Sequence, residues 1–133
     1  MRQINEIIIH CSATPENKDF TVDDIRSWHR QRGFNDIGYH YVIYRDGSVH
    51  KGRDEEFIGA HCKGHNSHSI GICYIGGLSV GSLVPKDTRT IAQKASLSEL
   101  VARLRAKYPN ASVHGHREFA NKACPCFDVN TDL

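Results

Sequence analysis

Residues 5–15 read N-E-I-I-I-H-C-S-A-T-P, and this segment carries the clearest strand signal in the chain. The three consecutive isoleucines Ile7–Ile9 form a continuous β-branched run, which is typical of a strand buried on both faces. The turn-prone segment Cys11–Pro15 follows directly. We therefore predict a buried strand over Asn5–His10, of the kind that occupies the middle of an α/β sheet.

Two helices are predicted further along the chain. Thr21 with Asp24 three residues later resembles an N-cap that opens a helix with an apolar face. A longer amphipathic helix is predicted from Asp87 or Thr88 to Lys107, because its apolar residues keep roughly one face. Because strand signals lie on either side of each helix, the two helices are expected to lie on the faces of a sheet.

The remaining strand signals complete the predicted sheet. They lie at Tyr39–Tyr44, Ser48–Lys51, Ser69–Ile75 and Ala111–His114, with a turn at Asp46-Gly47 and a final loop over Arg117–Phe127. Strands separated by helices indicate an α/β fold with a central mixed β-sheet flanked by α-helices. No linker, repeat or low-complexity tract interrupts the chain, so we expect residues 1–133 to form a single domain.

Composition excludes several classes of protein. The 133 residues contain 17 Lys+Arg and 15 Asp+Glu, for a formal net charge of +2, and no Lys/Arg run exceeds two residues. No nucleic acid or anionic membrane is therefore expected as a partner. With 39% hydrophobic and 24% charged residues, the chain is typical of globular proteins rather than disordered ones. We expect a monomer.

Targeting signals are not evident in the sequence. The polar start Met1–Glu6 leads into only three isoleucines, fewer than the roughly 7–15 apolar residues of a signal-peptide core. The longest uncharged apolar stretch, Ser69–Val84, contains four glycines and falls short of the about 18 residues of a membrane span. We therefore expect a protein that is cytoplasmic as synthesised, and that reaches any target outside the cytoplasm by another release route.

Nine histidines and five cysteines are the unusual part of the composition. Zinc favours His and Cys ligands, and catalytic zinc sites commonly use three protein ligands and leave one position for water. His10 at the end of the first predicted strand, His116 and Cys124 fit that count. The spacing contains no H-E-x-x-H and no paired C-x-x-C, so packing roles for these three side chains stay open.

The other histidines and cysteines have plainer interpretations. His29 is expected at the surface or in packing, and three histidines near turns are expected to be solvated: His50, His65 and His68. Three cysteines are expected to pack as small apolar side chains: Cys11, Cys62 and Cys73. Cys126 is open between a second ligand, a pairing partner and a structural role. His114 would share a face with His116 if that segment stays extended.

Blocks along nearly the whole chain carry a specific resemblance. They are Ile9–Thr14 (IHCSAT), Asp36–Ile43, Arg45–Val49, Gly52-Arg53, Gly59–His61, Lys63-Gly64, Asn66, Ser69–Cys73, Gly115–Glu118, Lys122–Pro125 and Phe127-Asp128. In this order they resemble zinc-dependent N-acetylmuramoyl-L-alanine amidases, the family of amidase-type bacteriophage lysozymes and peptidoglycan recognition proteins. Only Ser79–Asn110 lacks a distinctive motif.

This resemblance implies an activity and a set of site residues. It implies hydrolysis of the amide between the lactyl group of N-acetylmuramic acid and L-alanine, with peptidoglycan or a muropeptide as the partner and endolysin-like lysis of the cell wall as the outcome. One zinc ion per chain is implied at His10, His116 and Cys124. His116 rather than His114 matches the ligand position, because it directly precedes Arg117-Glu118.

Further roles follow from the same resemblance. Tyr39 and Lys122 match positions that assist the reaction in the phage-lysozyme branch, where other branches use a general-base glutamate. His61 and Asn66 fall in a segment that resembles the wall of the substrate groove. Since Lys122 is only two residues from Cys124, it is expected to stabilise an oxyanion near the metal. A phenol with an ordinary pKa is a poor base, so Tyr39 is expected to orient and stabilise.

Two alternatives belong to other functional classes. On the same fold, a non-catalytic module would recognise the muropeptide without cutting it, but in that branch the cysteine ligand is typically lost, whereas Cys124 is present here. A small redox or metal-storage protein using Cys124 and Cys126 would leave the motif around His10 unexplained. The amidase interpretation is the one that accounts for all of the blocks.

Overall fold

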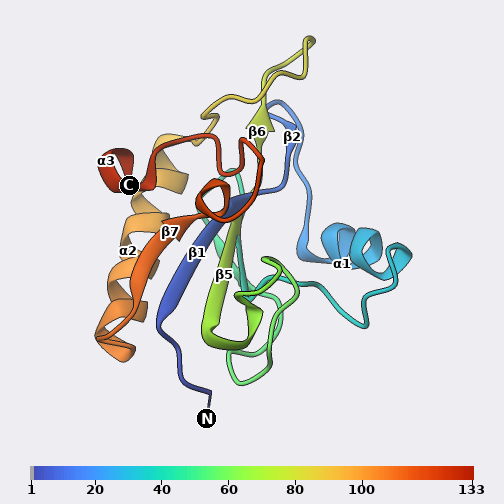
Figure 1. The fold of residues 1–133 in the computed structure, drawn as a ribbon. Coiled ribbons are helices and arrows are strands. Elements are labelled where there is room, and N and C mark those ends of the chain that lie inside the picture. The colour runs from blue at the N-terminus through green and yellow to red at the C-terminus, as the bar shows by residue number, and fades with distance from the viewer. Residues whose placement is uncertain (1) are drawn as a thin grey trace.

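The computed structural model describes residues 2–133 and centres on a five-stranded sheet with the strand order β4-β3-β5-β1-β7. The strands are β1 (Glu6–Cys11), β3 (Tyr41–Ile43), β4 (Val49–Lys51), β5 (Ser69–Tyr74) and β7 (Ser112–Gly115). Neighbouring strands are parallel except β3 and β4, which form an antiparallel hairpin. This mixed sheet, with helices on either side of it (Figure 1), confirms the predicted fold class.

Strand β1 runs through the middle of the core. It pairs with β5 on one side and with β7 on the other. Ile7, Ile8 and Ile9 are fully buried, as the continuous isoleucine run predicts. Because successive side chains of a strand point to opposite faces, Ile7 and Ile9 face one layer, while Glu6, Ile8 and His10 face the other.

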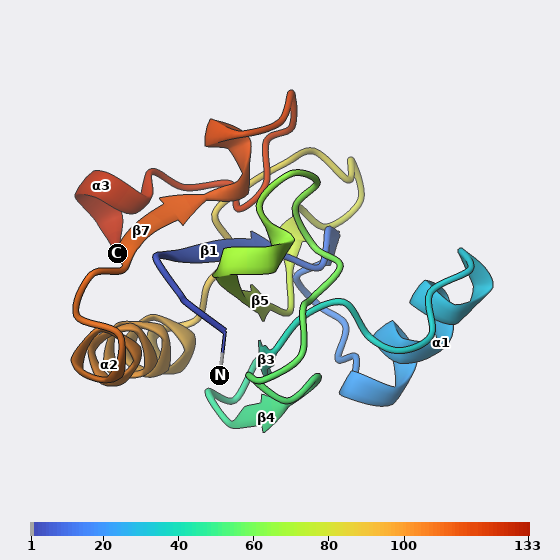
Figure 2. The ribbon, with the colours of Figure 1, turned by 60° about the horizontal axis from the view of Figure 1, so that its bottom comes forward.

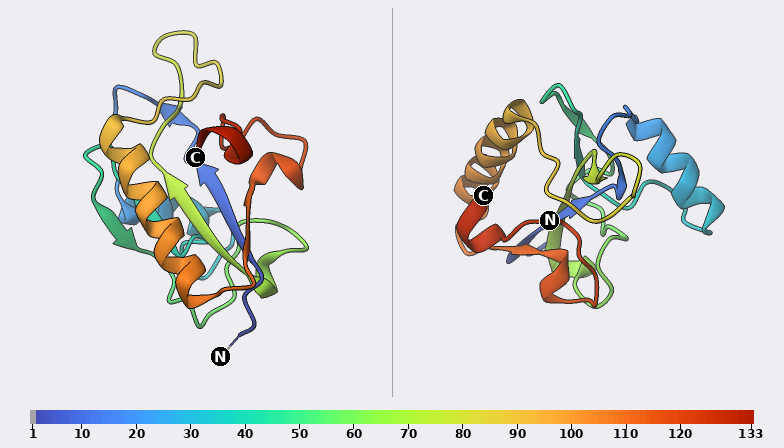
Figure 3. Two further views of the ribbon diagram at one scale, coloured as in Figure 1. Left: turned by 90° about the vertical axis from the view of Figure 1, so that its left-hand side faces the viewer. Right: turned by 90° about the horizontal axis from the view of Figure 1, so that it is seen from above.

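Helices α1 (Val22–Gln31) and α2 (Ile91–Lys107) cover opposite faces of the sheet (Figures 2 and 3). Leu97 and Leu104 of α2 belong to one apolar cluster with Ile7. Ile25 of α1 belongs to a second cluster with Val42. Burying one such side chain contributes about 1.5–3 kcal/mol. Among the helices of residues 2–133, none combines the length and apolarity needed to cross a bilayer.

Two local predictions are confirmed, and one predicted strand is shorter in the structure. Thr21 caps α1, because its Oγ1 accepts from the Asp24 N–H at 3.2 Å and the Asp24 carboxylate accepts from the Thr21 N–H at 2.8 Å. Gly47 adopts φ +89° in the predicted hairpin turn. The strand predicted over Tyr39–Tyr44 pairs only over Tyr41–Ile43.

The predicted start of the longer helix at residue 87 or 88 is wrong, since α2 begins at Ile91. Thr90 caps it instead: its Oγ1 accepts from the Gln93 N–H, and the Gln93 side chain accepts from the Thr90 N–H, both at 3.0 Å. Thr88 is not available as a cap, because its Oγ1 accepts from the Gly77 N–H at 2.7 Å. A contact between distant segments thus moves the start of the helix.

Several short elements connect the sheet to its loops. They are β2 (Thr14–Pro15) paired with β6 (Gly77–Leu78), the 3-10 turns η1 (Asn66–His68) and η2 (His116–Glu118), and the final helix α3 (Val129–Asp132). The sequence does not predict them, because two to four residues carry too little periodicity. Both 3-10 turns lie in segments that carry site residues.

Candidate metal centre and its cleft

His10, His116 and Cys124 converge at the carboxyl ends of the neighbouring strands β1 and β7. His10 lies at the end of β1, His116 directly follows β7, and Cys124 lies in the loop after η2. The Nδ1 atoms of His10 and His116 are 3.1 Å apart although 106 positions separate them in sequence. One ligand atom from each of the three side chains lies within 4.8 Å of the others.

The donor set fits a tetrahedral zinc ion. Zinc binds imidazole nitrogen at about 2.0–2.1 Å and thiolate sulfur at about 2.3 Å, so its ligand atoms stand about 3.3–3.8 Å from one another. The nitrogen–nitrogen distance of 3.1 Å and the 4.8 Å limit for the group are close to that spacing. Two imidazoles and one thiolate also leave one of four positions free for a reacting molecule.

Burial keeps the two imidazoles in their neutral, metal-binding form. Desolvation, followed by the neighbouring His61 and His116, lowers the pKa of His10 well below its ordinary value. Desolvation, followed by the Lys122 ammonium, also lowers the pKa of His116. The two imidazoles can therefore donate lone pairs to a cation at neutral pH. Cys124 Sγ accepts a hydrogen bond from the Cys11 N–H at 3.2 Å, which fixes its position beside them.

His114 points away from this group. Strand β7 ends at Gly115 and η2 begins at His116, so the segment does not stay extended and the two histidines do not act together. His114 Nδ1 lies 2.9 Å from a carboxylate oxygen of Glu118. The bend needs glycine, because a Cβ at Gly115 would stand 2.9 Å from Pro125 Cδ.

His61 lies directly behind His10. Its Nδ1 is 2.8 Å from His10 Nε2, and its Nε2 is 3.2 Å from Ser69 Oγ. The ring packs over Gly71, where a Cβ would come within 2.6 Å of it. With His10 Nε2 donating to His61, the lone pair of His10 Nδ1 is left free to face His116. The sequence identifies His61 only as groove wall, and no spacing signal indicates this contact.

Tyr39 and Lys122 lie on a cleft of about 490 Å³ that opens beside the metal centre. The cleft is lined by His29, Arg32, Phe34, Tyr39, Ala60, His61, Cys62, Lys63, Gly64, Asn66, His116, Phe119, Ala120 and Lys122. The Tyr39 ring centroid is 5.0 Å from that of His10. Burial raises the pKa of Tyr39 well above its ordinary value, so its hydroxyl stays protonated and donates. The exposed Lys122 lies at the mouth.

Asn66 shapes the wall of the cleft through its backbone contacts. Its Oδ1 accepts from the N–H groups of both His61 and Cys62 at 2.9 Å. His29, which also lines the cleft, is buried, and its Nδ1 accepts from the Gly38 N–H at 2.8 Å, so it has a packing role. The sequence does not indicate His29, Arg32 or Phe119 as cleft residues, since the end of α1 and the end of η2 contribute them from distant parts of the chain.

The remaining cysteines do not join the metal centre. Cys11, Cys62 and Cys73 are buried, as predicted. Cys126 Sγ lies 3.8 Å from Cys11 Sγ and 3.4 Å from the Gly77 carbonyl oxygen. Of the three roles left open for Cys126, these contacts support the structural one.

We expect the metal-free protein to lose stability as the pH falls below about 6.5. Burial, followed by His40 and His116, lowers the pKa of His61 to about 3. Between these values the unfolded chain binds a proton that the folded chain excludes, so acid favours unfolding by about 1.4 kcal/mol per pH unit from His61. Urea unfolding with a chelator present, between pH 6.5 and 5, measures this slope. His61→Gln should make the slope shallower, while His10 and His116, whose pKa values burial also lowers, keep their own contributions. A slope that is unchanged in this variant would contradict the buried neutral ring.

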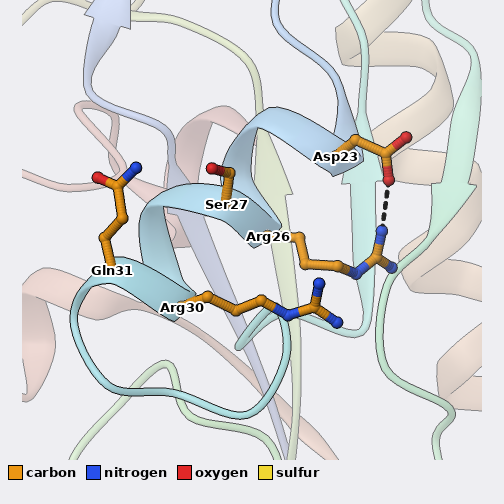
Figure 4. A pocket seen from close by; sticks show the side chains of 5 residues that line it. All are labelled: Asp23, Arg26, Ser27, Arg30 and Gln31. Atoms are coloured by element: carbon orange, nitrogen blue, oxygen red, sulfur yellow. Dashed lines mark hydrogen bonds and ion pairs between the residues drawn. The ribbon is translucent and has the colours of Figure 1, made fainter.

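A second hollow lies on the exposed side of α1 (Figure 4). It is lined by Asp23, Arg26, Ser27, Arg30 and Gln31, and Arg26 pairs with Asp23 at 2.6 Å. It contains no histidine, cysteine or buried titratable group. A charged helix face with an exposed ion pair is ordinary solvated surface. The cleft beside His116 is therefore the candidate functional site.

A comparison that covers almost the whole chain identifies its family. The profile of the N-acetylmuramoyl-L-alanine amidase family matches residues 1–127. The chain belongs to this amidase family. Its membership confirms the predicted fold and the predicted amidase activity on peptidoglycan.

Relatives of this amidase include phage enzymes and recognition proteins. The endolysin of Escherichia phage T7 is 46% identical over 123 residues, which cover 92% of this chain and 81% of that protein. The amidase LysC from Clostridium intestinale superposes with a TM-score of 0.82 at 30% identity, covering 93% and 77%. A point mutant of Drosophila PGRP-LB, solved in complex with tracheal cytotoxin, superposes with a TM-score of 0.78 at 29% identity, covering 94% and 76%.

Proposed function

We propose that this amidase uses one zinc ion, bound by His10, His116 and Cys124, to hydrolyse the amide between the lactyl group of N-acetylmuramic acid and L-alanine. The observation that carries the proposal is the convergence of these three ligands beside the cleft. The presence of Cys124 supports catalysis rather than recognition alone, because a third ligand completes a catalytic zinc set.

The metal and the side chains around it have separate tasks. When bound, zinc lowers the pKa of water toward about 7 and polarises a carbonyl group. The Lys122 ammonium at the cleft mouth can stabilise the negative charge that develops on the carbonyl oxygen of the scissile amide. Donors of this kind contribute about 10²–10³ in rate.

Tyr39 acts as a donor and not as a base. Burial raises the pKa of its hydroxyl, so at neutral pH the phenol keeps its proton. From the cleft wall it can hydrogen-bond the attacking water or the carbonyl oxygen. His61 is a positioning residue, since it contacts His10 and holds the orientation of that ring.

We infer the biological setting from the same site. The substrate is peptidoglycan or a released muropeptide, which the wall around His61 and Asn66 contacts. Residues 1–133 act as one amidase domain and as a monomer, and the protein acts on the cell wall after its release.

Mass spectrometry of digested peptidoglycan tests the proposed bond. Amidase cleavage frees the amino group of L-alanine and creates no new reducing sugar ends. New reducing ends, or cleavage between two amino acids of the stem peptide, would show that a different bond is cut. A digestion in the presence of a zinc chelator, followed by restoration with added zinc, tests the metal requirement.

A further inference from the structure

A second group of metal-ligating side chains lies at the opposite end of β1 from His10. Glu6 begins β1, and alternation places its side chain on the same face as His10. The two residues are four positions apart along the strand, which is about 13 Å. His65 and His68 approach Glu6 from the turn η1, just before β5. The group lies outside the cleft lining described above.

The turn explains why the two histidines act together. In a 3-10 turn, side chains three positions apart eclipse one another. The sequence His65-Asn66-Ser67-His68 has that spacing, with His65 capping the turn and His68 ending it. Both rings therefore project from one side of the turn, and that side faces the start of β1.

The ligand atoms of Glu6, His65 and His68 lie only slightly closer together than they would around a bound metal ion. One oxygen of Glu6, Oε1, lies 2.9 Å from His65 Nδ1 and 3.0 Å from His68 Nε2. The three ligand atoms all lie within 4.8 Å of one another. A tetrahedral ion with ligands at about 2.0–2.2 Å would separate them to about 3.4 Å, which needs only a few tenths of an ångström at each contact.

Surrounding side chains hold this arrangement in place. The His65 ring stacks on Phe119 with centroids 3.9 Å apart. The other Glu6 oxygen, Oε2, faces His114 Nε2 at 4.0 Å, and Glu118 holds the far nitrogen of that ring at 2.9 Å. The carboxylate is thus surrounded by three imidazoles. A divalent cation could bind the carboxylate and two of these rings together.

We propose that Glu6, His65 and His68 bind a second divalent transition-metal ion, with zinc as the cation that this His-His-Glu set suits best. The side chains are partly exposed, at 16%, 27% and 34% respectively, so solvent reaches the fourth position.

The ion would have a structural effect on the cleft. It fastens η1 to β1, and the same loop is closed by the Asn66 side chain on the His61 and Cys62 N–H groups. Binding at the Glu6 group therefore stabilises the wall of the cleft without contacting substrate. Its expected signature is a second equivalent of metal and a higher melting temperature.

A Cys124→Ala background isolates the proposed site from the first one. Isothermal titration of this full-length variant with zinc should give one equivalent of binding, and added zinc should raise its melting temperature. In that background, His68→Ala or His65→Ala should weaken binding by at least tenfold, the smallest loss expected when even an outer partner of a metal ligand is removed. His50→Ala is the matched control, because His50 stacks on Tyr44 in a different part of the fold, and it should bind zinc like its parent.

Glu6→Gln provides a second test of the proposed site in case a histidine variant folds poorly. The amide has the size of the carboxylate and can still hydrogen-bond imidazole, so the fold is expected to persist by far-UV circular dichroism while zinc affinity falls at least tenfold. No zinc binding in the Cys124→Ala background, or binding that is unaffected by Glu6→Gln and His68→Ala, would overturn the proposal.

Discussion

Cys124→Ala is expected to abolish wall-lytic activity, with a loss of at least about 10³-fold, which exceeds the cost of removing one oxyanion donor. The variant loses the sulfur that completes the three-ligand group with His10 and His116. Bound zinc should fall by one equivalent relative to the unchanged protein. The far-UV circular dichroism should stay native, because the core clusters are built around β1, β5 and the two long helices. Metal analysis and a turbidity assay on peptidoglycan measure both effects.

Cys126→Ala is the matched control for this prediction. It removes a thiol from the same loop, but one that contacts Cys11 and a backbone carbonyl instead of the histidines. Zinc content and activity should therefore match the unchanged protein. Full activity of Cys124→Ala without bound metal would contradict the proposed zinc mechanism. An equal loss of zinc and activity in Cys126→Ala would show that Cys126 is also a metal ligand.

Lys122→Ala is expected to lower kcat by about 10²–10³-fold while zinc content stays the same. The ammonium is exposed at the cleft mouth and close enough to lower the pKa of His116, which places its positive charge beside the metal centre. Its loss removes a positive charge that would stabilise the developing oxyanion, while the three ligand side chains are all retained. Steady-state kinetics on a soluble muropeptide, together with metal analysis, separates these two effects.

Two further variants test whether the positive charge of Lys122 is responsible for the effect on kcat. Lys122→Arg keeps the positive charge and should recover part of the rate. Lys94→Ala removes a lysine from the exposed side of α2 and should leave kcat unchanged. If Lys122→Ala matches the unchanged enzyme in kcat, then the charge does not act in the transition state.

Tyr39→Phe should keep zinc and slow turnover by about tenfold, the cost of about one hydrogen bond. The ring and its packing beside His10 are retained, and only the hydroxyl is lost. Because the phenol is protonated throughout the physiological range, the pH profile of kcat should keep its shape. A profile that loses an ionisation in the variant would identify Tyr39 as a base after all.

Much of the fold could be predicted because its signals are local. The isoleucine run of β1, the capping box at Thr21 and the glycine turn at Gly47 are each set by neighbours within a few residues. The start of α2 could not be predicted in this way, because Thr88 is held by the backbone of Gly77 on another segment. The turns η1 and η2 are too short for periodicity to indicate them.

The sequence alone determined the fold class, the family motifs and the residue types that a zinc amidase needs, because these depend on local pattern and on chemistry. Only the tertiary structure decided that His61 lies behind His10 and that Glu6 meets His65 and His68. Those contacts join residues 51, 59 and 62 positions apart. Strand order and the path of the loop over β1 create such contacts, and neither can be predicted from the spacing of residues along the chain.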